Sequence, residues 1–251
     1  MKLKQSEGWS MPADSPFYPQ LPAMYRNVKM HFVFFHAATE AVSEFLPEPL
    51  IAADDGLCVA GGIDVPFCTS YGSFQESLLL MKCCFRSKEG FYCSHVFHNG
   101  PAGIAAGREI YGTPKVFAEV QIQNSGPTLR TESSFAGVSI LQISSTMQEN
   151  TGQAAMPVLV PAWRLKIIPR ADGPGPAIKQ LIDCTKVTQD LEIHFQAKGQ
   201  GRIALGASPL CDLTPLVPIR YSSAYYIECS YSEGYAEVAH DYLHPSNASE
   251  A

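Results

Sequence analysis

Charged side chains are scarce in this chain: they make up 17% of its 251 residues, against an average of about 25%. Hydrophobic residues make up 46%, which excludes a predominantly disordered chain, because such chains are rich in charge and poor in apolar side chains. The 18 Lys and Arg residues are outnumbered by 24 Asp and Glu residues, giving a net charge of −6. This balance argues against nucleic acid as a partner, since its binding requires cations to displace phosphate counterions.

Several sequence features of other protein classes are also missing. No run approaches the ~18 apolar residues of a membrane-spanning helix, and no apolar stretch follows the N-terminal lysines. We therefore expect no membrane partner and a cytoplasmic location, with the eight cysteines as free thiols. No Cys pair has the spacing of a zinc site, and His95 and His98 would point to opposite faces of a strand. We expect no metal.

The chain divides into an arm, a domain and a tail. Residues 1–28 are rich in Pro and Ser and predict an extended N-terminal arm. Residues 29–243 contain no internal repeat, low-complexity block or linker, so we expect a single domain there. Residues 244–251 form a polar tail.

Most of the domain is predicted to be β-strand. The aromatic and β-branched run Lys29–His36 predicts the first strand, and Ala37–Leu46 predicts a helix that ends before Pro47. A second helix is predicted at Ala177–Asp183. The other predicted strands are Leu57–Phe67, Glu76–Phe85, Phe91–Phe97, Ile104–Ile110, Lys115–Gln123, Leu129–Phe135, Val138–Met147, Trp163–Ile168, Val187–Phe195, Arg202–Leu205 and Ala224–Tyr231. Many short strands separated by Gly, Pro and Asn turns indicate a sandwich or barrel, so the predicted fold class is mainly β (α+β).

Lys115 is the residue that most strongly suggests chemistry. It opens a strand directly after the turn Gly112-Thr113-Pro114, and strand alternation sends Val116 to the opposite face. A lysine at a strand edge commonly lies in solvent. In an apolar cavity, however, desolvation disfavours the ammonium form of a lysine and leaves an amine that can attack a carbonyl carbon. The residues alone leave both interpretations open.

A set of short motifs occurs along the chain in a specific order and spacing. They are Ser15-Pro16, Leu46-Pro47-Glu48-Pro49-Leu50, Glu76, Gly107-Arg108-Glu109-Ile110, Pro114-Lys115, Leu165-Lys166-Ile167-Ile168-Pro169, Asp172-Gly173 and Asp241-Tyr242-Leu243. In these motifs the chain resembles the acetoacetate decarboxylase-like superfamily, over roughly residues 15–243. From Glu76 to Lys115 the family pattern aligns without a gap, so these two positions share the register of the family.

The resemblance implies a fold, a reaction and two catalytic residues. It implies a single-domain, largely antiparallel β-barrel-like fold with a few flanking helices, assembled as a homo-oligomer. It implies that Lys115 forms a Schiff base with a small-molecule carbonyl substrate, without a cofactor, and that Glu76 lines the pocket near the reacting carbon. Taken alone, Glu76 could equally be a surface carboxylate at the start of a strand; the shared register favours the pocket.

At two positions the chain lacks a cation that the decarboxylases carry. Val116 stands where a second lysine follows the Schiff-base lysine, and Val28, after Asn27, stands where an arm arginine fits the substrate carboxylate. Burial alone would then have to favour the neutral amine of Lys115.

Other family pocket positions also differ. Gly61 replaces a second glutamate, and Asp64 could take its place only if the strand shifts. Thr113 replaces a tyrosine, although Tyr111 is near. We therefore count Tyr111, Thr113, Val116, Val28, Gly61 and Asp64 as candidate substrate-binding residues.

Three functions are compatible with these residues. The first is a lysine-imine lyase acting on a ketone or oxo acid, with decarboxylation as one outcome. The second is an aldolase, dehydratase or cyclase of secondary metabolism that uses the same imine, because an imine–enamine pair supports all of these reactions. The third is a barrel that binds a small carbonyl compound without turning it over.

Overall fold

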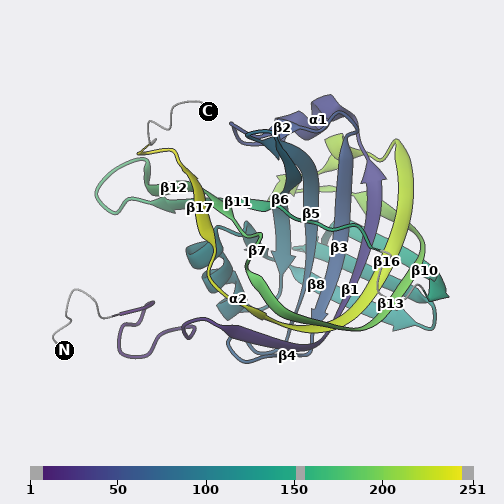
Figure 1. Ribbon diagram of the computed structural model, residues 1–251, viewed down its shortest axis with the longest axis horizontal. Helices are drawn as coiled ribbons and strands as arrows, with labels where there is room; N and C mark the ends of the chain where they lie inside the picture. The colour runs from purple at the N-terminus through teal and green to yellow at the C-terminus, as the bar shows by residue number, and fades with distance from the viewer. Residues whose placement is uncertain (1–7, 151–155, 245–251) are drawn as a thin grey trace.

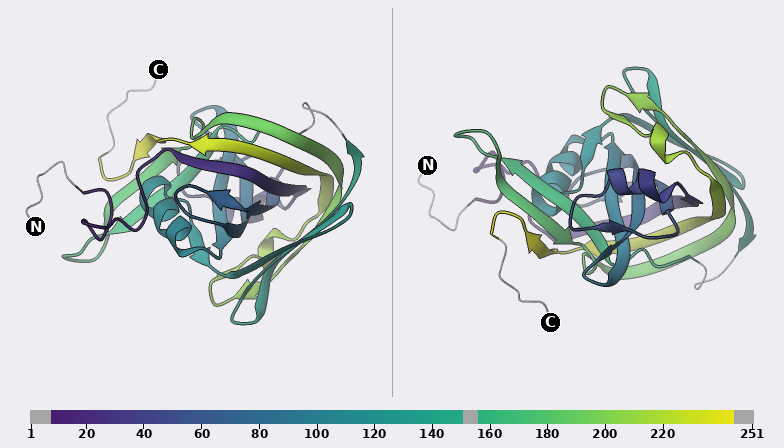
Figure 2. Two further views of the ribbon diagram at one scale, coloured as in Figure 1. Left: turned by 90° about the horizontal axis from the view of Figure 1, so that it is seen from below. Right: turned by 90° about the horizontal axis from the view of Figure 1, so that it is seen from above.

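A curled mixed sheet forms most of the molecule in the computed structural model, which describes residues 8–150 and 156–244 (Figure 1). Fifteen strands take part, in the order β17-β12-β11-β6-β5-β3-β1-β16-β13-β10-β9-β8, with β2, β4 and β7 pairing to β5, β1 and β6. Both β7 and β11 run parallel to β6, and the other pairs along this path are antiparallel. The end views show the sheet curling around its core without closing (Figure 2).

Seventeen strands and four short helical segments make up the described secondary structure. The strands are β1 (Ala23–His36), β2 (Ile51–Ala52), β3 (Leu57–Val65), β4 (Phe67–Cys68), β5 (Phe74–Phe85), β6 (Lys88–His98), β7 (Lys115–Phe117), β8 (Glu119–Ser125), β9 (Thr128–Phe135), β10 (Val138–Asn150), β11 (Ala162–Pro169), β12 (Pro176–Asp183), β13 (Thr188–Leu205), β14 (Ala207–Ser208), β15 (Cys211–Asp212), β16 (Arg220–Glu233) and β17 (Glu237–Asp241). The helices are α1 (Thr39–Glu44), α2 (Pro101–Ala106), the π-helix η1 (Gly107–Tyr111) and the 3₁₀-helix η3 (Thr214–Leu216). No helix among the described residues is long and apolar enough to cross a membrane.

The predicted mainly β fold with few helices is confirmed, and α1 lies inside the predicted helix Ala37–Leu46. Two elements were predicted wrongly. The predicted strand Ile104–Ile110 is helical, because Pro101 at the first turn and the alanines after it favour a helix. The predicted helix Ala177–Asp183 is strand β12, because pairing with β11 on one side and β17 on the other outweighs the helical spacing.

Two strands extend beyond their predicted bounds. The segments Val187–Phe195 and Arg202–Leu205 belong to one strand, β13, which continues through Gly199 and Gly201. A Cβ atom at Gly199 would lie 1.9 Å from the Thr146 carbonyl oxygen, so these glycines let β13 approach β10 closely. Strand β1 begins at Ala23, within the segment predicted as the extended arm.

Strand alternation gives the sheet two apolar faces. On β1, β3 and β5 the residues Val33, Ala60 and Leu79 are paired in register and belong to the main buried cluster, which β8 and β10 complete. The residues one position away on each strand point to the other face. Because β11, β13 and β16 cover that second face only in part, it has room for a cavity.

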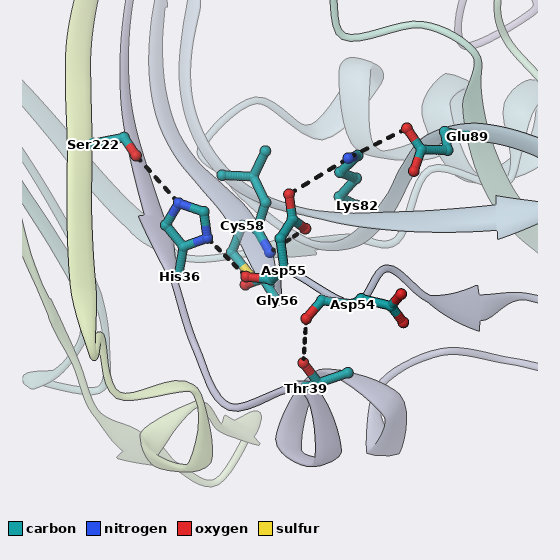
Figure 3. Close-up of polar contacts among 10 residues, drawn as sticks. His36, Thr39, Asp54, Asp55, Gly56, Cys58, Lys82, Glu89 and Ser222 are labelled. Atoms are coloured by element: carbon teal, nitrogen blue, oxygen red, sulfur yellow. Dashed lines mark hydrogen bonds and ion pairs between the residues drawn. The ribbon is translucent and has the colours of Figure 1, made fainter.

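A polar turn closes the end of the sheet beside α1 (Figure 3). The ring of His36 donates from Nδ1 to the Asp55 carbonyl at 2.7 Å, and the Asp55 carboxylate lies 3.4 Å from Lys82 Nζ. Gly56 has φ +58°, and a Cβ atom there would lie 2.2 Å from the Ala37 carbonyl oxygen. Only glycine fits this turn without strain.

Candidate active site

A cavity of about 620 Å³ occupies the second face of the sheet. Pairing in register places Phe32 opposite Gly61, Gly61 opposite Leu78, and Leu78 opposite Val96. Phe32, Leu78 and Val96 line the cavity, because these residues share one face of four adjacent strands. The wall is mostly aliphatic and aromatic, and its Asp, Glu, Lys and Arg side chains are Glu76, Lys115, Arg164 and Glu233.

Lys115 projects into this cavity from the short strand β7, which pairs with β6 at Val96. Its Nζ lies 2.9 Å from Oε2 of Glu76, and both side chains are 13% exposed. The same Nζ lies 5.3 Å from the centre of the Phe74 ring, so the ring face adds a cation–π contact. A Cβ atom at Gly107 would lie 2.9 Å from Lys115 Cδ, so the missing side chain of Gly107 makes room for the lysine.

His98 supports Glu76 from the adjacent position on β6. Its Nε2 lies 3.7 Å from Glu76 Oε2, its ring stacks on Phe74 at 4.3 Å, and its Nδ1 accepts a hydrogen bond of 2.8 Å from the Gly100 N–H. Because Nδ1 accepts, the proton of the neutral ring belongs on Nε2, on the side of Glu76. A Cβ atom at Gly103 would lie 2.6 Å from Nε2, so the missing side chain of Gly103 leaves room for the His98 ring.

Electrostatics favour a charged glutamate beside a neutral histidine. Burial, with the nearby Lys115 ammonium, lowers the pKa of His98 to about 4. For Glu76, burial opposes ionisation and is the largest single effect, but the charge and hydrogen bond of Lys115, together with His98 and Arg164, hold the pKa of the carboxyl below its usual range. The site thus presents an ammonium–carboxylate pair, and a proton can pass between the two groups over 2.9 Å.

Tyr111 and Thr113 also line the cavity, and the structure shows what their hydroxyls bind. The Tyr111 hydroxyl donates to the Gly234 carbonyl at 2.7 Å, which ties the end of η1 to the loop after β16. The Thr113 Oγ1 accepts a hydrogen bond of 2.8 Å from Nη1 of Arg164. Both residues are almost fully buried.

The other four candidate substrate-binding residues are not part of the cavity wall. Val116 packs against the main buried cluster, because strand alternation turns it away from Lys115. Val28 is fully buried beside Cys229 of β16.

Gly61 and Asp64 lie on β3, which keeps its register throughout. The ring of Phe32 fills the space of the missing side chain at Gly61: a Cβ atom there would lie 2.7 Å from the ring. Asp64 lies one residue beyond the wall residue Ile63 and accepts a hydrogen bond of 3.1 Å from Gln75. The shift that would bring Asp64 into the pocket does not occur.

Two charged residues of the wall were missed in the sequence. Arg164 lies on β11 between Trp163, which is fully buried, and Leu165. Its guanidinium carbon lies over the Tyr111 ring, 5.6 Å from the ring centre. Glu233 ends β16 and accepts a hydrogen bond of 2.9 Å from the Tyr25 hydroxyl, and burial raises the pKa of its carboxyl. A signal for Arg164 existed: a charged residue inside an apolar strand of a charge-poor chain.

Residues of the Gly-Arg-Glu-Ile and Leu-Lys-Ile-Ile-Pro motifs hold the segment that carries Lys115. Arg108 Nη1 donates to the Lys115 carbonyl at 3.1 Å, and Lys166 Nζ donates to the Ile110 carbonyl at 3.3 Å. Gly112, with φ +70°, lets the turn approach Lys166, because a Cβ atom there would lie 2.5 Å from the lysine Cα. These contacts fix the backbone on both sides of the reactive amine.

No cluster of three or more His, Cys, Asp or Glu side chains suited to a metal ion occurs within residues 8–150 and 156–244. All eight cysteines are free.

The chain is similar to known proteins over almost its whole length. Residues 10–243 match the family described as acetoacetate decarboxylase (ADC). Acetoacetate decarboxylase 1 of Bradyrhizobium diazoefficiens is 28% identical over 242 residues, covering 94% of each chain. Acetoacetate decarboxylase from Legionella pneumophila superposes with a TM-score of 0.85 at 22% identity, covering 97% of this chain and all of that one. The enduracididine biosynthesis enzyme MppR, in complex with pyruvate, superposes with a TM-score of 0.80 at 20% identity, covering 94% and 98% of the two chains.

Proposed function

Because the chain belongs to the acetoacetate decarboxylase family, we propose that it is a lyase whose Lys115 forms an imine with the carbonyl carbon of a ketone or oxo acid. The observation that carries this proposal is the placement of Lys115 Nζ, 2.9 Å from the Glu76 carboxylate in a mostly apolar cavity. A free amine is needed for attack on a carbonyl, and Glu76 is placed to take the proton that must leave first.

The reaction begins with a proton transfer. Glu76 accepts a proton from the Lys115 ammonium, and the freed amine forms a C–N bond to the carbonyl carbon, whose oxygen becomes a hydroxyl. Glu76 returns its proton to this hydroxyl, which leaves as water, and a protonated imine remains. Glu76 is again a carboxylate, placed to stabilise the iminium charge.

For a 3-oxo acid, the protonated imine allows decarboxylation. The C–C bond to the carboxylate breaks, carbon dioxide leaves, and the bonding electrons move toward the nitrogen to form an enamine. Protonation of the enamine carbon followed by addition of water releases the ketone and restores the Lys115 amine. Apolar walls such as Phe74 and Leu78 keep bulk water from the intermediates.

The size of the cavity favours a second candidate, in which the enamine attacks another carbonyl carbon. At about 620 Å³, the cavity lies in the range of roughly 300–1,000 Å³ that accommodates drug-sized ligands. Met30, Phe32 and Leu80 add apolar surface to the wall besides the residues around Lys115. Aldol addition, dehydration or cyclisation of a larger substrate would use the same Lys115 imine.

Borohydride trapping tests the imine directly. The protein is incubated with a methyl ketone or an oxo acid, reduced with sodium borohydride, and digested for mass spectrometry. We expect a reduced adduct on Lys115 that is lost in Lys115→Ala and retained in Lys88→Ala, a matched change at an exposed hairpin lysine. Absence of any adduct on Lys115, with ligand binding intact in Lys115→Ala, would refute the enzyme and support a binding barrel. Carbon dioxide release from trapped acids separates decarboxylation from the carbon–carbon bond-forming alternative.

A further inference from the structure

Arg164 is a cation of the cavity wall without a carboxylate partner. Within the described part of the chain it forms one hydrogen bond, from Nη1 to Thr113 Oγ1 at 2.8 Å, and no ion pair within 4.0 Å. Its other close contact is the ring face of Tyr111. A guanidinium carries five N–H donors in a fork that matches a carboxylate. The single bond to Thr113 therefore leaves most of this binding capacity unused.

No carboxylate of the wall forms an ion pair with Arg164 within 4.0 Å among the described residues, although the charges of Glu233 and Glu76 act on it over a longer distance. Glu76 is already paired with Lys115 at 2.9 Å, and the Glu233 carboxyl accepts a hydrogen bond from Tyr25 at 2.9 Å. Burial raises the pKa of Glu233 against the opposing effect of Arg164 and Lys115. Removing a charge from water without a counterion costs several kcal/mol. An anion supplied by a ligand would therefore stabilise the charge of Arg164 in the cavity wall.

The backbone brings Arg164 to the reacting end of the cavity. Thr113, which binds its guanidinium, lies two residues before Lys115, and the Lys115 N–H donates to the Thr113 carbonyl at 2.7 Å, so a tight turn keeps the two residues close together. Met30 and Phe32 of β1, two strands away from Glu76 on β5, line an apolar part of the wall. A ligand that satisfies both Arg164 and this apolar part has one carboxylate close to its carbonyl carbon and an apolar substituent further away.

We propose that Arg164, oriented by Thr113, binds the carboxylate of a monocarboxylic oxo acid with an apolar chain while Lys115 attacks its carbonyl carbon. This assignment rests on the function proposed above and narrows its substrate to acids. It also gives Thr113 a role as a positioning residue, which holds the guanidinium without touching the substrate.

Matched acid and ketone probes test the assignment. Trapping on Lys115 is titrated with 2-oxohexanoate, with 3-oxohexanoate and with 2-hexanone, in which a methyl group replaces the carboxylate. Because a hydrogen bond to a charged group contributes about 1.5–3 kcal/mol, we expect Arg164→Gln to raise the half-saturating concentration of at least one acid by about 10- to 150-fold. The half-saturating concentration of 2-hexanone should stay within about twofold, because the ketone has no carboxylate for the guanidinium to bind. Arg170→Gln, an exposed change at the end of β11, should alter neither.

Further variants separate a positioning role from a structural one. Thr113→Val should weaken trapping of the acid but spare the ketone, and Thr113→Ser, which keeps the hydroxyl, should restore the wild-type ratio. The proposal would be overturned if Arg164→Gln and Arg164→Lys weakened trapping of the acid and of the ketone equally. It would also be overturned if neither variant weakened trapping of either acid.

A carbonyl-free probe distinguishes failure of this assignment from failure of the imine mechanism. Binding of hexanoate is measured by calorimetry in Lys115→Ala, with and without Arg164→Gln. If nothing labels Lys115 in the wild-type protein, yet hexanoate binding requires Arg164, the imine mechanism is wrong and the anion site stands. If hexanoate binding is indifferent to Arg164, the anion site is wrong.

Discussion

Replacing Gly107 by alanine should separate activity from stability. Gly107 has φ −59° and ψ −42°, a helical backbone that alanine adopts without strain. Its hypothetical Cβ atom would lie 2.9 Å from Lys115 Cδ and 3.0 Å from Cε, and the third-nearest atom is also in the Lys115 side chain. The substitution therefore acts almost entirely on the position of the reactive amine.

The effects on stability nearly cancel. Alanine in place of glycine inside a helix gains about 1 kcal/mol. Ordinary contacts begin near 3.4 Å, so the lysine must move by about 0.5 Å, and leaving its rotamer minimum costs about 0.5–1.5 kcal/mol. For a chain of this size the melting temperature should stay within about 4 °C of wild type. Activity has no compensating gain: misplacement by about 1 Å can cost about 100-fold, so we expect a loss of about 10-fold or more.

The assay pairs the rate of borohydride-trapped imine formation with a thermal unfolding curve. Gly173→Ala is the control, because a Cβ atom there contacts nothing within 4 Å and the residue lies in an exposed turn far from Lys115 in sequence. Wild-type imine formation in Gly107→Ala, with an unchanged or raised melting temperature, would refute the view that the lysine must hold its observed position. A large loss of stability would refute the claim that the clash is confined to one flexible side chain.

Two further predictions concern stability. Burial lowers the pKa values of His31, His95 and His98 to about 4. Between about pH 6.5 and pH 4 the unfolded chain therefore binds more protons than the folded chain, and the free energy of unfolding should fall by up to about 4 kcal/mol for each pH unit of acidification. Denaturant unfolding at pH 7 and pH 5 measures this fall, and equal stability at both pH values would contradict it. Gly56→Ala should lower the free energy of unfolding by more than the about 1–3 kcal/mol that a left-handed backbone costs alanine, because its Cβ atom also meets the Ala37 carbonyl oxygen. Gly137→Ala is the control, because this residue has φ +77° and open space around it, so the variant measures the backbone strain alone. An equal loss of stability in both variants would show that the contact with Ala37 is relieved.

The sequence was sufficient to predict the strands of the fold wherever alternation or β-branched residues were strong. It failed at Ile104–Ile110, where Pro101 and the alanines after it favour a helix, and η1 then packs against β11. It failed again at Ala177–Asp183, because pairing with β11 is a contact between segments that the local pattern does not contain. Pairing between distant strands, more than local propensity, determined these segments.

The candidate site was predicted in part for a similar reason. Lys115 and Glu76 could be found because they keep a fixed register within one stretch of chain. His98 was considered only as a metal ligand with His95, and Arg164 was not considered at all, because their places in the cavity depend on pairing across β5, β6 and β11. A charged residue inside an apolar strand was the available signal for Arg164, but its sequence does not show which face it occupies.

In the folded chain, the positive charge of the cavity comes in part from another residue than the sequence comparison suggested. The sequence comparison treated Val28 and Val116 as two lost cations, yet residue 116 faces the main core, so any side chain there would point away from the Lys115 amine. The positive charge of the cavity comes instead from Lys115 and Arg164, and Glu76 neutralises only the first. A substrate without an acid group would leave the guanidinium of Arg164 without a carboxylate at ion-pair distance among the described residues. Loss of the arm arginine therefore does not argue against an acidic substrate, because another strand supplies a guanidinium to the same cavity.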